Sequence, residues 1–295
     1  MPDAVAAVVT PVRNGAAWIE QTMRSVLDQT AVCSGRARLR YIVMDGGSTD
    51  GTQDIVRAVG GNAVELVSER DAGMYAALAK GFRQVAGDSD VCAYVNAGDL
   101  WHLGALDVVL DVLQLPGVDW VSGYRVAYNA AAQIVHVTLP STYRARLIAT
   151  GAYGTTLPSI QQESTFWRSS LLESVDLDHL ADFRLAGDYY LWRCFAERTT
   201  LYTVAALLGG FRMHGGHLSG ARATYAAEVR SMTRRPGFSD RVIGCLDRPI
   251  WVAPDGVKKA LGRHQILRYD VAKDSWTKGG TRRLPTHRWH DRVRV

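Results

Sequence analysis

Hydrophobic residues follow two alternating patterns along the first hundred residues. Short apolar runs rich in β-branched residues predict buried strands, and between them apolar residues recur at helical spacing, as in Trp18, Met23, Val26 and Leu27. The predicted strands cover residues 4–9, 41–44, 64–67 and 91–95, and the predicted helices cover residues 18–28, 52–59 and 74–85. Strands that alternate with helices in this way are typical of parallel strands with crossover helices. The pattern therefore predicts an open α/β sheet.

The pattern changes in the second part of the chain. Two apolar runs between residues 118 and 138 flank the segment 129–132, which predicts a hairpin or meander. Residues 164–167 predict another strand and residues 188–196 a helix. Residues 200–208 are then expected to return towards the sheet.

Polar residues end each of the first four predicted strands. Residues 10–14 follow the first strand, Asp45 the second, residues 69–71 the third and residues 96–99 the fourth. In an open parallel sheet, ligands bind beyond the carboxyl ends of the strands. We therefore expect these four segments to meet at one edge of the sheet and to form a ligand site there.

Four sequence blocks at these strand ends resemble family 2 of the glycosyltransferases. The blocks are Val9-Thr10-Pro11-Val12-Arg13-Asn14, Asp45-Gly46-Gly47-Ser48-Thr49-Asp50-Gly51-Thr52, Asp71-Ala72-Gly73-Met74-Tyr75 with Lys80-Gly81, and Val95-Asn96-Ala97-Gly98-Asp99. A weaker match covers residues 161–168, 186–191 and 210–214. The resemblance implies the GT-A fold, an open, mixed but mostly parallel sheet flanked by helices. It also implies transfer of one sugar from a nucleotide-diphosphate donor to an acceptor hydroxyl, with inversion at the anomeric carbon.

The resemblance assigns the donor site to residues in these blocks. They are Thr10, Pro11, Val12, Asn14, Asp45, Asp71, Lys80, Asn96, Ala97 and Gly98. The Asp45 carboxylate can accept the imide N–H of uracil or thymine, or the N1 and N2 hydrogens of guanine, so UDP-, GDP- and dTDP-linked sugars all remain open. The alternative role for Asp45 is to cap the turn that follows it.

Asp99 is the candidate metal ligand. A diphosphate leaving group needs its developing charge neutralised, and a hard cation such as Mn²⁺ or Mg²⁺ held by carboxylate oxygen does this. Family members usually place two carboxylates here, whereas this chain has Asn96 and Gly98 beside Asp99. His214 is a second candidate ligand, with an ordinary turn residue as its alternative role.

Asp188 is the candidate general base. Direct inverting displacement requires removal of a proton from the acceptor hydroxyl as it attacks the anomeric carbon, and a nearby carboxylate can accept that proton. The alternative role for Asp188 is to cap the helix that follows it, and the two roles are compatible.

Composition is that of a globular protein. The chain has 295 residues, of which 47% are hydrophobic and 21% charged, so it can bury a full core, and disorder or a coiled coil is not expected. Four widely spaced cysteines predict reduced thiols rather than a zinc site. No apolar run reaches the roughly 18 to 20 residues that a membrane span needs, and the first ten residues lack a signal-peptide pattern. We expect a cytoplasmic location.

Charge is distributed unevenly along the chain. Residues 221–295 hold 17 Lys and Arg against 7 Asp and Glu, which leaves an acidic body in a chain of net charge +5. Arginines interleaved with Trp251, Trp276 and Trp289 suit an anionic membrane surface, which favours peripheral association at its inner face. A helical appendage with a solvated charged face is the alternative. No nucleic-acid-binding motif accompanies the charge, so we do not expect a nucleic-acid partner.

These observations predict two parts of the chain and one leading function. Residues 1–220 are expected to form the GT-A domain, with a nucleotide-sugar-binding half over residues 1–117 and an acceptor-binding half over residues 118–220, and residues 221–295 a basic appendage. The acceptor is expected to be a carbohydrate or a lipid-linked sugar, in polysaccharide or glycolipid synthesis. A degenerate nucleotide-sugar-binding protein is the first alternative. A sugar nucleotidyltransferase is the second, although residues 10–15 lack the glycine-rich loop with Arg and Lys of that class.

Overall fold

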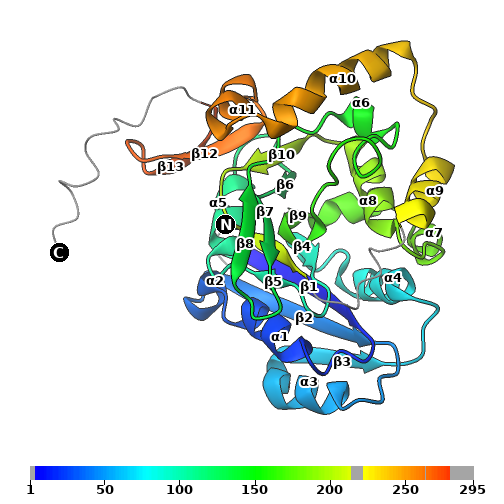
Figure 1. Ribbon diagram of the computed structural model, residues 1–295. Helices are drawn as coiled ribbons and strands as arrows, with labels where there is room; N and C mark the ends of the chain where they lie inside the picture. The colour runs from blue at the N-terminus through cyan, green and yellow to red at the C-terminus, as the bar shows by residue number, and fades with distance from the viewer. Residues whose placement is uncertain (1–3, 214–221, 263, 280–295) are drawn as a thin grey trace.

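The fold is described from a computed structural model of the chain, over residues 4–213, 222–262 and 264–279. Its centre is a nine-stranded sheet with the order β13-β12-β10-β6-β9-β4-β1-β2-β3 (Figure 1). A second sheet has four strands in the order β5-β11-β7-β8. Most neighbouring strands of the large sheet are parallel, but β9 runs antiparallel to both β4 and β6 and β13 runs antiparallel to β12, so the sheet is mixed.

The first hundred residues form the parallel part of the large sheet. Its strands are β1 (Ala4–Val12), β2 (Ala37–Asp45), β3 (Val64–Ser68) and β4 (Val91–Tyr94). The helices between them are α1 (Ile19–Leu27), α2 (Thr30–Cys33), α3 (Thr52–Gly60) and α4 (Met74–Val85). These elements confirm the alternation predicted from the apolar pattern. β1 is longer than expected because residues 10–12 stay paired with β2, up to the pair Val12 and Asp45.

The middle of the chain completes both sheets. It adds the strands β5 (Leu100–Trp101), β6 (Trp120–Ser122), β7 (Arg125–Tyr128), β8 (Ile134–Thr138), β9 (Thr165–Arg168), β10 (Leu201–Val204) and β11 (Gly209–Arg212). Its helices are α5 (Ala105–Val112), α6 (Ala145–Ile148), α7 (Leu177–Ala181) and α8 (Gly187–Ala196), with short 3₁₀ turns at η2 (Gln162–Ser164) and η3 (Ser169–Ser174). A further 3₁₀ turn, η1 (Gly61–Ala63), lies earlier in the chain, between α3 and β3. The hairpin predicted between residues 118 and 138 is formed by β7 and β8.

The C-terminal part of the described chain returns to the large sheet. It consists of α9 (Arg222–Met232), α10 (Phe238–Val252), α11 (Asp255–Leu261), β12 (Ile266–Asp270) and β13 (Ser275–Lys278). β12 pairs in parallel with β10, so these last strands extend the main sheet. The division of the chain at residue 220 stays a prediction.

Aromatic side chains fill the core under α8. Trp192 of α8 stacks on Trp120 of β6 with 5.5 Å between ring centroids, and it meets Trp167 of β9 edge to face at 5.8 Å. Aromatic residues bury roughly 150–250 Å² each, and paired rings add about 0.5–1.5 kcal/mol beyond that burial. This packing fixes α8 against the sheet and thereby fixes the position of Asp188 in its first turn.

None of the helices in the described residues combines the length and the apolar character that crossing a membrane requires.

Candidate functional site

The predicted strand-end segments lie at one edge of the large sheet. β1 lies between β2 and β4 and is parallel to both, so all three strands end at the same edge. Asp45 is the last residue of β2, and Asp99 follows the end of β4 by five residues. Two strands of the same parallel set thus carry the two acids, with the end of β1 between them.

Hydrogen bonds join the loop after β1 to the glycine-rich loop after β2. The backbone N–H of Asn14 donates to Ser48 Oγ at 2.7 Å, and Asn14 Oδ1 accepts the Thr49 N–H at 2.9 Å. The Gly15 N–H donates to buried Thr52 Oγ1, also at 2.9 Å. The hydrogen bond from Thr52 lowers the pKa of the Asp50 carboxyl, which holds the same loop. Asn14 therefore has a clear structural role, and its contact with the donor stays a prediction.

The Asp45 carboxylate is buried and held by its own loop. It accepts the Ser48 N–H at 3.2 Å and the Ser68 hydroxyl of β3 at 2.6 Å. These contacts fit the capping role, and they also fix the carboxylate in place at the end of β2. An acceptor held rigidly in this way is suited to recognising donor N–H groups.

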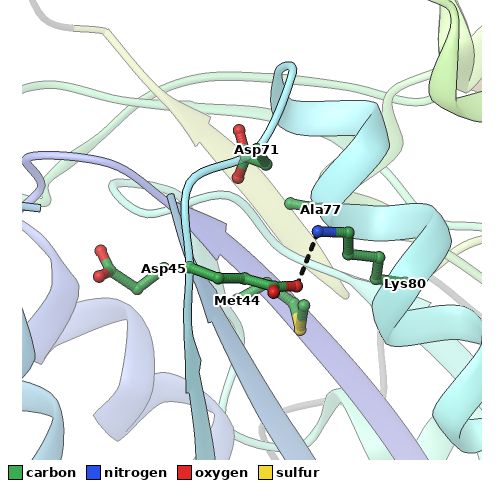
Figure 2. Close-up of a pocket in the computed structure, with 6 residues that line it drawn as sticks. Met44, Asp45, Asp71, Ala77 and Lys80 are labelled. Carbon is green, nitrogen blue, oxygen red and sulfur yellow. Dashed lines mark hydrogen bonds and ion pairs between the residues drawn. The ribbon is translucent and has the colours of Figure 1, made fainter. Parts of the chain in front are cut away.

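A small pocket opens beside Asp45. It is lined by Met44, Asp45, Glu69, Asp71, Ala77 and Lys80. Figure 2 shows Lys80 of α4 reaching across to its ion-pair partner, whereas the carboxylate of Asp45 points away from that pair. The partner is Glu69, at 2.7 Å. Asp71 lies on the loop before α4, and its Oδ1 accepts the Gly73 N–H at 3.0 Å. The structure thus brings Asp45, Asp71 and Lys80 to one pocket.

Three predicted donor contacts lie inside the sheet. Thr10 is fully buried, and its hydroxyl is within 2.9 Å of the Tyr41 hydroxyl. Pro11 and Val12 are also buried, and the Val12 carbonyl accepts the Gly46 N–H at 2.9 Å. These contacts stabilise the end of β1, at the edge of the sheet where the site lies. Direct contacts of the three residues with the nucleotide-sugar donor stay predictions.

The turn after β4 has a backbone that requires glycine at one position. Gly98 has φ of +116°, which side-chain-bearing residues rarely adopt. Its N–H donates to Thr22 Oγ1 of α1, and the same hydroxyl donates to the Asp99 carbonyl, both at 2.9 Å. The absence of a second carboxylate at position 98 therefore has a conformational reason. Ala97 lies beside Gly15, which joins this turn to the loop after β1.

Asp99 forms a hydrogen-bonded carboxyl pair with Glu163. Burial raises the pKa of Asp99 well above its usual range, and the charge of Glu163 raises it further. Burial also raises the pKa of Glu163. The backbone N–H of Arg212 donates to Asp99 Oδ1 at 2.9 Å, and this hydrogen bond lowers the pKa of Asp99. Two buried acids in contact must share a proton or a cation, because two like charges in a poorly solvated site repel each other.

Glu163 was not among the predicted site residues. It lies in the 3₁₀ turn η2, directly before β9, and β9 brings it to Asp99 by pairing antiparallel with β4. Gln161 and Gln162 precede it and tie this turn to β7 and β4, through hydrogen bonds to Val126 and to the Tyr94 carbonyl. An acid between two glutamines and an apolar strand was the sequence signal that could have identified it.

Asp188 is surrounded by tyrosines. Its Oδ1 accepts the Tyr189 N–H at 2.7 Å, and the Tyr225 hydroxyl lies 3.4 Å away. Tyr75 of α4 also hydrogen-bonds to it, and the Tyr75 ring lies so close to Gly187 that a Cβ there would approach it to 2.4 Å. Burial raises the pKa of Asp188 to about 7, and the charge of Glu163 raises it in the same direction. The candidate base and the carboxyl pair are therefore electrostatic neighbours.

Helix α9 holds the loop that precedes the candidate base. Glu228 Oε2 accepts the backbone N–H groups of Leu185 at 2.9 Å and Ala186 at 2.8 Å. These are donors near the start of α8, which would otherwise lack partners. Together with Tyr225, Glu228 shows that residues beyond position 220 position Asp188.

The oxygen atoms around Asp99 suit a divalent cation, but they are too few to fill its coordination shell. Asp99 and Glu163 supply carboxyl oxygens, and Asn96 Oδ1 is buried without a partner among the described residues. Oxygen ligands suit Mn²⁺ and Mg²⁺. No group of three or more His, Cys, Asp or Glu in residues 4–213, 222–262 and 264–279 could hold an ion by itself, so phosphate oxygens would have to complete the shell. His214 lies outside the described residues.

One tryptophan and one lysine after position 220 are buried rather than exposed at the surface. Trp251 is buried against Tyr143 and Tyr153, with ring centroids 5.1 Å and 5.9 Å away. Lys258 is also buried, and its ammonium donates to the Leu139 carbonyl at 2.8 Å. Trp289 lies outside the described residues. Trp251 and Lys258 therefore cannot form a membrane contact in this fold.

Comparisons with known proteins identify the family and the fold. The sequence model described as "Glycosyl transferase family 2" matches residues 7–168. No curated protein matches the chain by sequence. Among solved structures, S. aureus TarS 1–349 is similar with a TM-score of 0.55 at 13% identity, covering 89% of this chain and 70% of that one.

Two further solved structures contain a metal and a donor. Mannosyltransferase PcManGT from Pyrobaculum calidifontis, in complex with GDP-Man and Mn²⁺, has a TM-score of 0.55 at 19% identity and covers 88% of this chain and 76% of that one. Glucosyl-3-phosphoglycerate synthase from Mycobacterium tuberculosis, in complex with Mn²⁺, UDP-glucose and phosphoglyceric acid, has a TM-score of 0.50 at 19% identity and covers 80% and 82%. At these identities the likeness establishes the fold.

Proposed function

The chain belongs to glycosyltransferase family 2 and has the GT-A fold, and from this premise we propose that it transfers one sugar from a nucleotide-diphosphate donor to an acceptor hydroxyl with inversion. The observation that carries the proposal is the placement of acids at the rim. Asp45 lies at the end of β2, the Asp99–Glu163 pair lies beyond the end of β4, and Asp188 is close enough for Glu163 to raise its pKa. This arrangement supports separate binding sites for the nucleobase at Asp45, for the diphosphate at the Asp99–Glu163 pair and for the acceptor hydroxyl at Asp188.

Asp45 is proposed to recognise the nucleobase. Its carboxylate is held by Ser48 and Ser68, so it can accept donor N–H groups without further ordering of the side chain. UDP-, GDP- and dTDP-linked sugars all offer such donors. Solved relatives bind UDP-GlcNAc, GDP-Man and UDP-glucose, which supports a nucleotide sugar as the donor class.

Asp99, Glu163 and Asn96 are proposed to hold a divalent cation, Mn²⁺ or Mg²⁺, together with the donor phosphates. When bound, such an ion neutralises charge that develops on the diphosphate as it leaves. The chain's own part is to present carboxyl oxygens that exchange their shared proton for the ion. Arg212 holds one Asp99 oxygen in place through its backbone N–H.

Asp188 is proposed to be the general base. Its carboxylate accepts the acceptor hydroxyl proton while the hydroxyl oxygen forms the new bond to the anomeric carbon and the bond to the diphosphate breaks. A base with a pKa of about 7 is half ionised at neutral pH and is also basic enough to accept a proton, which is near the optimum for such a group. Tyr75 and Tyr225 orient the carboxylate.

The acceptor is proposed to be a carbohydrate or lipid-linked sugar, in polysaccharide or glycolipid synthesis. A cytoplasmic location with peripheral attachment to the membrane suits such an acceptor. A catalytically degenerate nucleotide-sugar-binding protein is the second candidate, because Gly98 leaves the turn after β4 with one carboxylate.

Donor hydrolysis tests the proposal against this alternative. The purified chain is incubated with UDP-, GDP- and dTDP-linked sugars in Mn²⁺, Mg²⁺ or EDTA, while melting temperature and nucleoside diphosphate release are measured. We expect one nucleotide class to raise the melting temperature and to be cleaved only with the ion. Asp99→Asn should lose cleavage, and Asp54→Asn, an exposed control on α3, should keep it. Binding without cleavage would identify the degenerate protein, and absence of binding would refute a donor site.

A further inference from the structure

Helix α10 differs from an ordinary surface helix because its two acids are buried while several of its apolar side chains are exposed. Its acidic residues Asp240 and Asp247 face the protein and are 3% and 4% exposed. Trp251 also faces inward, but other apolar residues of α10 face outward, with exposures of 85% for Phe238, 41% for Val242 and 65% for Leu246. A surface helix normally buries its apolar stripe and exposes its charges. The apolar face of α10 is therefore available to something other than the core.

The inward acids are neutralised from the protein side. Arg144 holds Asp247 through two hydrogen bonds of 2.7 Å and 3.0 Å. Asp240 accepts hydrogen bonds from Arg234 and Arg146, which lower the pKa of its carboxyl. These ion pairs set which side of α10 faces inward. Because these ion pairs hold Asp240 and Asp247 on the inner side of α10, the side chains on the opposite side of the helix are exposed.

The exposed apolar residues form one continuous stripe. Phe238, Val242 and Leu246 repeat every four residues, so they lie on one side of the helix. Val252 at the end of α10 is also exposed, at 86%, as are Val257 and Leu261 of α11, at 45% and 62%. Figure 1 shows α10 along the upper edge of the molecule, with α11 beyond one end of it.

The charges beside this stripe are all positive. Arg241 and Arg248 of α10 are exposed and lie two helical turns apart, on the same side of the helix. Arg235, also exposed, precedes the helix. None of the three forms an ion pair with a described residue, and the acids of residues 233–254 are the two buried ones. An apolar stripe with a purely positive border matches a surface that is both apolar and anionic.

We infer that the face formed by Phe238, Val242, Leu246, Arg241 and Arg248 docks on an anionic lipid surface, with the apolar side chains among the acyl chains and the arginines at the phosphate groups. A second copy of the chain fits less well, because a two-fold contact would set arginines against arginines. A nucleic acid offers phosphates but no partner for the apolar stripe. The inference gives the proposed transferase a position at a membrane, and it stands on the α10 surface alone.

Vesicle binding by the full chain tests the inference. Co-sedimentation is measured with phosphatidylcholine vesicles and with vesicles that also contain phosphatidylglycerol. We expect binding to the anionic vesicles only. Phe238→Ser with Leu246→Ser should lower the partition coefficient at least about tenfold, because both side chains leave the acyl region. Arg241→Gln with Arg248→Gln should also lower it and should weaken its dependence on salt.

Matched variants separate this face from general charge and stickiness. Arg38→Gln with Arg198→Gln removes two exposed arginines elsewhere, and Leu103→Ser with Val135→Ser removes two exposed apolar side chains elsewhere. Both should bind as the natural chain does. Equal losses of binding in these controls would overturn the inference, because binding would then depend on charge and apolar surface in general. Unchanged binding of Phe238→Ser with Leu246→Ser would also overturn it, because the α10 face would then not be needed for binding.

Two further measurements exclude other occupants and failure of folding. Sedimentation should find a monomer, and a dimer dissociated by Phe238→Ser with Leu246→Ser would assign the face to a second copy instead. RNA binding lost in the same variant would likewise overturn the inference. Metal-dependent donor hydrolysis in solution should be unchanged in every variant. Docking without any hydrolysis would refute the proposed function alone, and hydrolysis without docking would refute this inference alone.

Discussion

Replacing Asp188 by Asn is expected to stabilise the protein at alkaline pH while it removes activity. Burial raises the pKa of this carboxyl from 3.8 to about 7. Above pH 4, folding therefore either protonates the carboxyl or buries a poorly solvated charge, and both lower the free energy of unfolding. Each pKa unit corresponds to about 1.36 kcal/mol, which gives an upper limit of about 4 kcal/mol at pH 8. Because the side chain is only partly buried by exposed area, we expect about 2 kcal/mol.

The pH dependence has a definite sign. Below pH 4 the carboxyl is protonated in both the folded and the unfolded chain, so it contributes nothing against folding. As pH rises from 4 to 7, the unfolded chain releases the proton and the folded chain retains it, so the free energy of unfolding falls. Above pH 7 the loss is complete. Asn is neutral throughout, so the advantage of Asp188→Asn should be largest at pH 8 and should fall by more than half at pH 5.

Urea unfolding at pH 5 and pH 8 measures the effect, with Asp54→Asn as an exposed control that should show no such dependence. Transfer by Asp188→Asn should fall about 100- to 10,000-fold, as for loss of a general base, with donor affinity unchanged. An advantage that is equal at both pH values would refute the reasoning about burial. Normal transfer would refute the assignment of the base.

Four other outcomes are expected. The kcat of the natural enzyme should rise with pH and level off above about 7 as Asp188 ionises; a flat profile between pH 5 and 8 would contradict this. Glu163→Gln should raise the Mn²⁺ concentration needed for half-maximal hydrolysis about 10- to 100-fold, and an unchanged titration would remove Glu163 from the ion site. Asp45→Asn should raise the donor KM roughly 10-fold with little change in kcat, and the reverse pattern would exclude base recognition. Glu228→Ala should cost about 1–3 kcal/mol of stability and lower kcat more than KM, because two N–H groups before α8 lose their acceptor; Glu228→Gln should largely restore both.

The sequence predicted the elements that depend on local pattern. The four strands of residues 4–94 and the helices α1, α3 and α4 were predicted from apolar spacing, because the spacing itself records which face is buried, whereas the short helix α2 was not predicted. The meeting of Asp45 and Asp99 at one edge followed from parallel topology, which fixes where strand ends lie. Both inferences needed no knowledge of distant contacts.

Features that depend on distant contacts were missed. Glu163 reaches Asp99 only because β9 enters the sheet antiparallel, between β4 and β6. Tyr225 and Glu228 reach the Asp188 region because α9 packs on α8, from beyond the expected end of the domain. Trp251 was expected at the surface, but the arginines that hold the acids of α10 turn it inward. No spacing rule within one segment contains that information.

The pairing of β12 with β10 has a consequence for synthesis of the chain. β10 is flanked by β6 and β12, and β12 is made more than sixty residues after β10. Until the ribosome releases residues 266–270, one side of β10 offers unpaired N–H and C=O groups, which can recruit strands from other nascent chains. A stop codon or frameshift before residue 266 should therefore yield aggregates rather than a shortened enzyme.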